Sequence, residues 1–144
     1  MSDVLTLSQI RMPGAARSKD DAIRETGEIL VDVGAVTPAY IDSMFERERS
    51  VSTYMGNYLA IPHGTNESKE SIKRSALSVI RYPEPIDWDG NEVLFALGIA
   101  GYQGGHMDIL SRIAIVFSDT DEVDKLVAAG SAQEIYDLLN AVNE

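Results

Sequence analysis

The first third of the chain follows two different hydrophobic periods. Residues 4–11 alternate loosely between apolar and polar positions, which predicts a first strand. Residues 18–34 follow helical spacing, with a capping-box-like start and a glycine at the end. Thr37-Pro38 begins a second helix through a polar cap and a proline at the first helical position, and that helix ends in the charged run Glu46–Arg49. The expected core positions of the two helices are Ala22, Ile23, Thr26, Ile29, Leu30, Val33, Ile41, Met44 and Phe45.

The middle of the chain is dominated by strand patterns. Tyr58–Ile61 predicts a short buried strand, and Ala76–Tyr82 predicts another. We expect the second to end at Pro83 and Pro85, because proline cannot donate a ladder hydrogen bond. Asp89-Gly90 is a turn signal between apolar segments, so it predicts a hairpin whose second strand is Val93–Ala100.

Helical patterns return in the last third. Residues 106–117 have helical spacing after a glycine-rich loop, although their C-terminal half is apolar enough for a strand. Residues 121–129 and 132–142 predict two more helices, and residues 66–72 could begin a short one. The whole predicts an α/β fold, with a mixed sheet of four to five strands sandwiched between helices, in a single domain of residues 1–144. The strand order does not follow from the sequence.

Composition limits the class of protein. With 144 residues the chain can bury the core of one domain, and its 44% hydrophobic and 24% charged residues are typical of soluble globular proteins. Its apolar runs are shorter than the roughly 20 residues that span a bilayer, and the N-terminus does not resemble a signal peptide. The absence of cysteine excludes disulfides, thiolate nucleophiles and zinc-thiolate sites. We therefore expect a cytoplasmic protein that does not insert into the membrane.

The formal net charge of −11 narrows the choice of partner. Nucleic acids and anionic membranes attract basic surfaces, so neither is expected to bind this chain. An acidic surface can instead attract a basic protein. The charge alone is equally well explained as an aid to solubility.

His63 is the first candidate for chemistry. It is one of two histidines, and it stands between Pro62 and Gly64 directly after the predicted strand Tyr58–Ile61. A rigid turn can present an imidazole as a nucleophile near neutral pH, for example toward phosphorus. The alternative is a histidine that packs against its neighbours or caps the turn.

His106 and an arginine are the next candidates. His106 follows a glycine pair and precedes a predicted helix, so two histidines at helix starts could meet around one phosphate. A guanidinium binds phosphoryl oxygens through two parallel hydrogen bonds, and Arg47 or Arg49 could supply it. The alternative for His106 is an ordinary polar helix start, and for the arginines it is a solvated helix end. The residues alone do not choose between Arg47 and Arg49.

Other kinds of site lack their signatures. The loop at residues 101–105 has neither the spacing nor the lysine of a nucleotide phosphate loop. The histidines are not spaced as metal ligands, and the glycine-serine-glycine elbow of serine hydrolases is missing. We therefore predict no cofactor and no metal.

Four segments and one histidine together resemble a known family, the IIA component of the bacterial phosphoenolpyruvate-dependent sugar phosphotransferase system. The version is the mannitol type of the fructose–mannitol class. The resemblance covers nearly the whole chain, from about Leu5 to the last helix. It is carried by Glu46–Glu48, Thr53–Gly56, Ala60–Thr65, Gly98–Ala100 and His106.

The resemblance implies a function and a site. His63 is similar to the phosphorylated histidine, which accepts a phosphoryl group from the phosphocarrier protein HPr and passes it to a cysteine of the IIB component. The membrane IIC component then imports and phosphorylates the sugar, here mannitol. Arg47 is similar to the active-site arginine and His106 to the second active-site histidine. The family's fold is an α/β sandwich.

An alternative function and two structural expectations accompany this resemblance. The alternative function is a regulatory IIA-like protein of the nitrogen type, whose phosphorylation controls partner binding, although the mannitol-like Thr53–Gly56 favours transport. Because the chain ends at Glu144, we expect IIB and IIC on a separate polypeptide. We also expect an apolar rim around His63, for which Tyr54, Met55, Tyr58 and Tyr102 are candidates; the alternative for each is an ordinary core residue.

Overall fold

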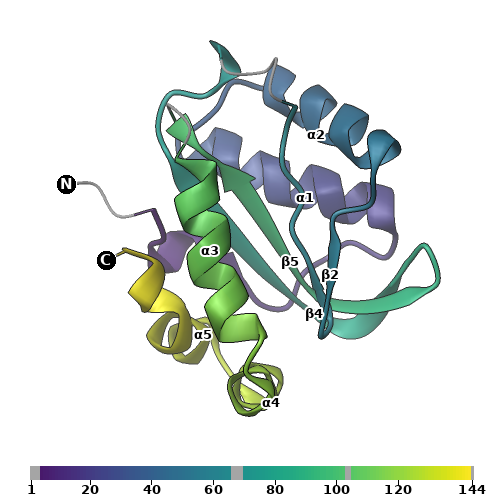
Figure 1. Ribbon diagram of the computed structural model, residues 1–144, viewed down its shortest axis with the longest axis vertical. Helices are drawn as coiled ribbons and strands as arrows, with labels where there is room; N and C mark the ends of the chain where they lie inside the picture. Colours follow the sequence, from purple (N-terminus) through teal and green to yellow (C-terminus); the bar gives the residue numbers. More distant parts are fainter. Residues whose placement is uncertain (1–3, 66–69, 103–104, 144) are drawn as a thin grey trace.

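One mixed sheet organises the structure, which is a computed structural model. It describes residues 4–65, 70–102 and 105–143, except for the side chains of His106 and Ala141. The sheet has five strands in the order β1-β4-β5-β3-β2 (Figure 1). They are β1 (Ile10–Arg11), β2 (Tyr54–Gly56), β3 (Leu59–Ala60), β4 (Ala76–Trp88) and β5 (Asn91–Ala100). The strand β4 is antiparallel to β5, and β5 is parallel to β3.

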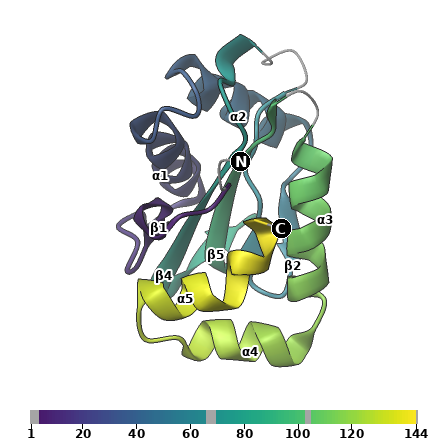
Figure 2. The ribbon, with the colours of Figure 1, turned by 90° about the vertical axis from the view of Figure 1, so that its left-hand side faces the viewer.

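Helices cover both faces of this sheet (Figure 2). In the described part of the chain they are α1 (Lys19–Asp32), α2 (Ala39–Ser50), α3 (His106–Phe117), α4 (Thr120–Ala128) and α5 (Ala132–Leu139), followed by a 3₁₀ turn, Asn140–Asn143. One core cluster lies between the sheet and α1 with α2, and a second lies between the sheet and α3, α4 and α5. The predicted α/β sandwich is therefore confirmed. No helix in the described ranges combines the length and apolar character needed to cross a bilayer.

The two cores follow from alternation along the central strands. Leu77 and Val79 of β4 point into the cluster under α3, whereas Ala76 and Ile80 point into the cluster under α1. Successive side chains of a strand point to opposite faces, so a strand buried on both sides reads as one apolar run. This is why Val93–Ala100 is one apolar run and why Ala76–Tyr82 is mostly apolar, with Ser78 and Arg81 as its polar positions.

Small residues let α1 approach the sheet closely. The Ser78 hydroxyl donates to the carbonyl oxygen of Thr26 at 2.9 Å. A Cβ atom on Gly98 would lie 2.5 Å from the Ser78 oxygen and 2.8 Å from Thr26 Cβ. The close contact fixes α1, and with it α2, against the sheet.

Two strand predictions are wrong in their extent. Only Ile10–Arg11 of residues 4–11 forms a strand, because the Gln9 side chain donates to the carbonyl oxygens of Val4 and Leu77 and folds the preceding residues into a 3₁₀ turn. The strand β4 does not end at the prolines but continues to Trp88. Its register against β5 shifts between Arg81 and Ile86, so both prolines lie in an irregularity where a missing N–H costs no ladder bond.

The predictions for the hairpin, for residues 106–117 and for residues 66–72 have different outcomes. The hairpin turn at Asp89-Gly90 is confirmed, with both residues at positive φ. Residues 106–117 are helical throughout, so the strand alternative is wrong. The short strand β2 was not predicted. Residues 66–69 of the possible short helix lie outside the described residues, and Ile72 forms an isolated bridge with Val36.

Glu25 on α1 is a buried carboxylate, with 5% of its surface exposed. It accepts hydrogen bonds from the backbone N–H groups of Ala15 and Ala16, from the Tyr82 hydroxyl and from Arg11. Burial acts to raise the pKa of Glu25, but these donors, led by the N–H of Ala15, outweigh it and hold the pKa below its ordinary value. Glu25 therefore stabilises the fold in its ionised form.

We expect Glu25→Gln to lower the free energy of unfolding at pH 7 by about 2 kcal/mol. Since the folded pKa lies below the unfolded value of about 4.3, this contribution is present above that pH and is lost as the pH falls through the folded pKa. Urea unfolding of both proteins between pH 7 and pH 3 should show the gap narrowing toward acid. Glu28→Gln, an exposed change on the same helix, should show little gap at any pH. A gap for Glu25→Gln that stays constant with pH would contradict this account.

Candidate active site

His63 lies at the edge of the sheet where two parallel strands end. It follows β3 and forms an isolated parallel bridge with Ile99, near the end of β5. The N–H of Ile99 donates to the carbonyl oxygen of Pro62 at 3.0 Å. Crevices at the carboxyl ends of strands are where open α/β sheets commonly bind ligands. The backbone of His63 is therefore an extension of the sheet, which makes its position rigid.

The ring of His63 is oriented by its own backbone. Its Nδ1 atom lies 2.7 Å from the carbonyl oxygen of Ile61. A carbonyl oxygen can only accept, so this contact assigns the proton to Nδ1 and the lone pair of the neutral ring to Nε2. The side chain is half-buried. The arrangement can present Nε2 as a nucleophile, a distinction that the sequence did not provide.

Arg47 lies in the last turn of α2 and is half-buried, whereas Arg49 is exposed. The Arg47 guanidinium donates to the carbonyl oxygen of Val51 at 2.8 Å. Two residues later, the carbonyl oxygen of Thr53 accepts the N–H of Ile61 at 3.0 Å. The segment that Arg47 contacts is therefore bonded to the segment that orients His63.

The buried side chain of Glu48 connects α2 to the segment that contains Val51 and Thr53. Its carboxylate is 3% exposed and accepts hydrogen bonds from the backbone N–H and hydroxyl of Thr53 and from Trp88 Nε1. Lys19 Nζ lies 3.5 Å from the same carboxylate. A buried carboxylate with this many donors fixes the geometry of what it contacts. Glu48 thus anchors Thr53, which in turn pairs with Ile61.

His106 is the first residue of α3. Its side chain lies outside the described residues, so the predicted pairing of His106 with His63 stays a prediction. The backbone places the start of α3 beside the end of β5, since the N–H of Gly105, directly before α3, donates at 3.1 Å to the carbonyl oxygen of Tyr102, two residues after β5. The start of α3 and His63 therefore flank the end of the same strand.

Comparison with known proteins identifies the family. Residues 3–142 match the sequence model of the family described as "Phosphoenolpyruvate-dependent sugar phosphotransferase system, EIIA 2". The chain belongs to this family. The resemblance noted in the sequence is therefore confirmed at the level of the family.

Named relatives agree with this EIIA 2 assignment. The "Mannitol-specific phosphotransferase enzyme IIA component" of Halalkalibacterium halodurans is 50% identical over 141 residues, which cover 98% of this chain and 97% of the relative. The Escherichia coli IIAMtl chain, solved in complex with phosphorylated IIBMtl, has a TM-score of 0.89 at 28% identity, covering 95% and 97% of the two chains. The nitrogen regulatory protein IIA-Ntr of Neisseria meningitidis has a TM-score of 0.78 at 28% identity, covering 94% and 96%.

The predicted apolar rim of this EIIA 2 protein is only partly where it was expected. Tyr102 is 46% exposed and follows β5 at the His63 edge. Met55 and Tyr58 are exposed too, but they flank Asn57, whose side chain donates to the carbonyl oxygen of Phe117 at the far end of α3. Tyr54 packs against the core under α1. Tyr102 alone of the four residues therefore remains a candidate for the rim.

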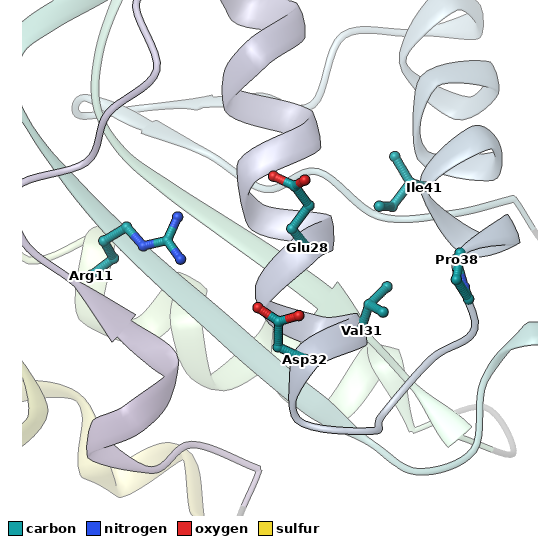
Figure 3. Close-up of a pocket in the computed structure, with 6 residues that line it drawn as sticks. All are labelled: Arg11, Glu28, Val31, Asp32, Pro38 and Ile41. Atoms are coloured by element: carbon teal, nitrogen blue, oxygen red, sulfur yellow. The ribbon is translucent and has the colours of Figure 1, made fainter.

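A separate hollow lies between α1 and the start of α2 (Figure 3). It is open and shallow, and it shares no lining residue with the surroundings of His63. Its lining residues are Arg11, Glu28, Val31, Asp32, Pro38 and Ile41. This hollow is therefore separate from the His63 edge of the sheet. Within the described residues, no group of three or more histidine or acidic side chains could hold a metal ion.

Sequence reasoning missed Tyr40 and Glu48 as contributors to this site. Together with Met44 they are the buried residues of α2, and they recur four positions apart. Residues four apart lie on one face of a helix, so this spacing was the available signal. Glu48 belongs to the charged run Glu46–Arg49, a pattern that is typical of a solvated helix end.

Proposed function

We propose that this protein carries a phosphoryl group on Nε2 of His63 in a mannitol phosphotransferase system. It accepts the group from phosphorylated HPr and passes it to the IIB component of the mannitol permease. The observation that carries the proposal is the Nδ1 contact with the Ile61 carbonyl at 2.7 Å, beside the end of β5. When the ring is neutral, this contact places its lone pair on the other nitrogen.

The two transfers balance without a cofactor. In the first, the Nε2 lone pair attacks phosphorus, a P–N bond forms, and the P–N bond of the donor breaks as its imidazole leaves. In the second, the thiolate of IIB attacks the same phosphorus and the P–N bond of His63 breaks. While phosphorylated, the ring bears more positive charge, and its Nδ1–H bond to the Ile61 carbonyl becomes charge-assisted and therefore stronger. The ring is neutral again after each cycle.

Arg47 and His106 have electrostatic roles in this proposal. Negative charge spreads over the phosphoryl oxygens during transfer, and a guanidinium or an imidazole N–H stabilises it. These groups must not hold the phosphorylated form too tightly, because equal binding of ground and transition states does not accelerate the second transfer. We therefore expect the site around His63 to be shallow, since HPr and IIB must cover it in turn.

Several observations favour mannitol transport over the regulatory alternative. The relative that is 50% identical carries the mannitol-specific name, whereas the IIA-Ntr structure is 28% identical. The Escherichia coli chain with phosphorylated IIBMtl is also the closer structural match of the two, at a TM-score of 0.89 against 0.78. A cytoplasmic location fits both partners. The net charge of −11 suits association with a basic partner and opposes binding to nucleic acid or anionic membranes.

A reconstituted system tests the proposal. The protein is incubated with phosphoenolpyruvate, enzyme I and HPr, and then with membranes that contain either a mannitol or a fructose IIBC component. We expect mannitol phosphate with the first membranes and much slower formation of fructose phosphate with the second. Phosphorylation of the protein without mannitol phosphate would favour the regulatory alternative. No phosphorylation at all would overturn both.

A further inference from the structure

Tyr40 lies beneath the candidate active site, in the first turn of α2. Only 3% of its surface is exposed. Its hydroxyl donates to the carbonyl oxygen of Ile99 at 2.7 Å and accepts the backbone N–H of Gly64 at 2.8 Å. A hydroxyl has one proton to donate and lone pairs to accept, so it can make both bonds at once.

These two bonds hold His63 on both sides. Gly64 follows His63 in the chain, and Ile99 is the residue paired with His63 across the sheet. The N–H of Ile99 also donates to the carbonyl oxygen of Pro62 at 3.0 Å. The residues before and after His63 are therefore both fixed to Ile99, one directly and the other through Tyr40.

The protonation state of Tyr40 suits this role. Burial raises the pKa of Tyr40 to about 12, although the N–H of Gly64 acts in the opposite direction. The hydroxyl therefore keeps its proton at neutral pH and can donate to Ile99 while it accepts from Gly64. Because the Gly64 N–H is used in this bond, it does not serve as a donor to phosphoryl oxygens.

We propose that Tyr40 is a positioning residue for phosphoryl transfer, whose hydroxyl fixes the backbone at His63 so that Nε2 faces donor and acceptor in turn. The proposal rests on the function proposed above. Orientation of a reacting group can change a rate by large factors even when the positioning group is remote from the chemistry. Both transfers use the same nitrogen in the same place, so a loss of positioning should slow both by a similar factor.

Tyr40→Phe tests this inference, because it removes the hydroxyl and keeps the ring. Tyr82→Phe is the matched control, since Tyr82 is fully buried and its hydroxyl donates to Glu25, away from His63. Single-turnover rates of uptake from phosphorylated HPr and of delivery to IIB are measured over a range of partner concentrations, so that both the limiting rate and the KM are obtained. We expect Tyr40→Phe to slow both rates by roughly ten- to a hundredfold with KM values near those of wild type. Tyr82→Phe should remain within about twofold of wild type, because its bond does not touch the site.

Clear outcomes would overturn the inference. Tyr40→Phe rates within twofold of wild type, an effect on KM alone, or an equal loss in Tyr82→Phe would each show that Tyr40 does not position the nucleophile. A wild-type protein that takes no phosphoryl group on His63 would instead overturn the proposed function, so the two failures are distinguishable.

A spectroscopic readout keeps the test independent of folding yield and of transfer itself. In wild-type protein the Gly64 amide should be protected from hydrogen exchange, and the imidazole nitrogen shifts of His63 should show the Nδ1–H tautomer. In Tyr40→Phe the Gly64 protection should fall, and the tautomer signal should shift toward a mixture. A wild-type Gly64 amide that exchanges as fast as an open loop would overturn the inference even if the variant failed to fold.

Discussion

Replacing His63 by alanine should give a folded protein that accepts no phosphoryl group from HPr. The nucleophilic nitrogen is removed, and the second histidine, His106, is proposed to stabilise the phosphoryl group and not to accept it. The His63 side chain is half-buried and belongs to neither apolar core cluster. We therefore expect the free energy of unfolding to change by no more than about 1 kcal/mol.

The measurement is phosphorylation by phosphoenolpyruvate, enzyme I and HPr, followed by intact mass spectrometry. His106→Ala is the matched control, and it should still gain one phosphoryl group at a reduced rate. Thermal unfolding of both variants checks that the fold is retained. A His63→Ala protein that still becomes phosphorylated on histidine would show that the nucleophile is a different residue.

Replacing Arg47 by alanine should slow phosphoryl transfer by roughly 10²- to 10³-fold, the usual cost of losing one electrostatic stabiliser of a transition state. The guanidinium donates to the Val51 carbonyl oxygen, on the segment that is paired with Ile61. This bond links the guanidinium to the segment that pairs with the strand before His63. The rates of uptake and delivery in single-turnover experiments measure the loss.

The chain offers a matched control for this arginine. Arg49 carries the same side chain two residues later in the same helix but is exposed, so Arg49→Ala should stay within about twofold of wild type. Arg47→Lys should recover only part of the rate, because an ammonium cannot form two parallel bonds to phosphoryl oxygens. Equal losses in the two alanine variants, or no loss in Arg47→Ala, would refute the electrostatic role of Arg47.

The helices and the position of His63 were predictable because their signals are local. Ser18 caps α1 through the N–H of Asp21 as the sequence indicated, and Gly34 ends it at a positive φ. His63 was marked by its proline and glycine neighbours, which are adjacent in the sequence. Local signals of this kind agree with the folded structure because they depend on only a few neighbouring residues.

The features that were predicted wrongly or missed depend on contacts between residues that are distant in the sequence. Nothing local indicates that β4 passes two prolines, since the register shift against β5 decides it. Nothing local assigns Trp88 as a hydrogen-bond donor to Glu48, which lies 40 residues earlier in the chain. The hydrogen bond from Tyr40 to Ile99 likewise joins residues that are 59 positions apart. The choice between Arg47 and Arg49 likewise came from the resemblance and stays a prediction; Arg47 is half-buried and Arg49 is exposed.

The central claim is that Nε2 of His63 carries the phosphoryl group, and NMR that correlates phosphorus with the imidazole nitrogens tests it most directly. The protein is labelled with ¹⁵N in its two histidines, phosphorylated through HPr, and then mixed with the IIB component. We predict one phosphorus signal coupled to Nε2 of His63, with Nδ1 still protonated, and loss of that signal when IIB is added. Coupling to Nδ1, coupling to His106, or a signal that persists in the presence of active IIB would contradict the account.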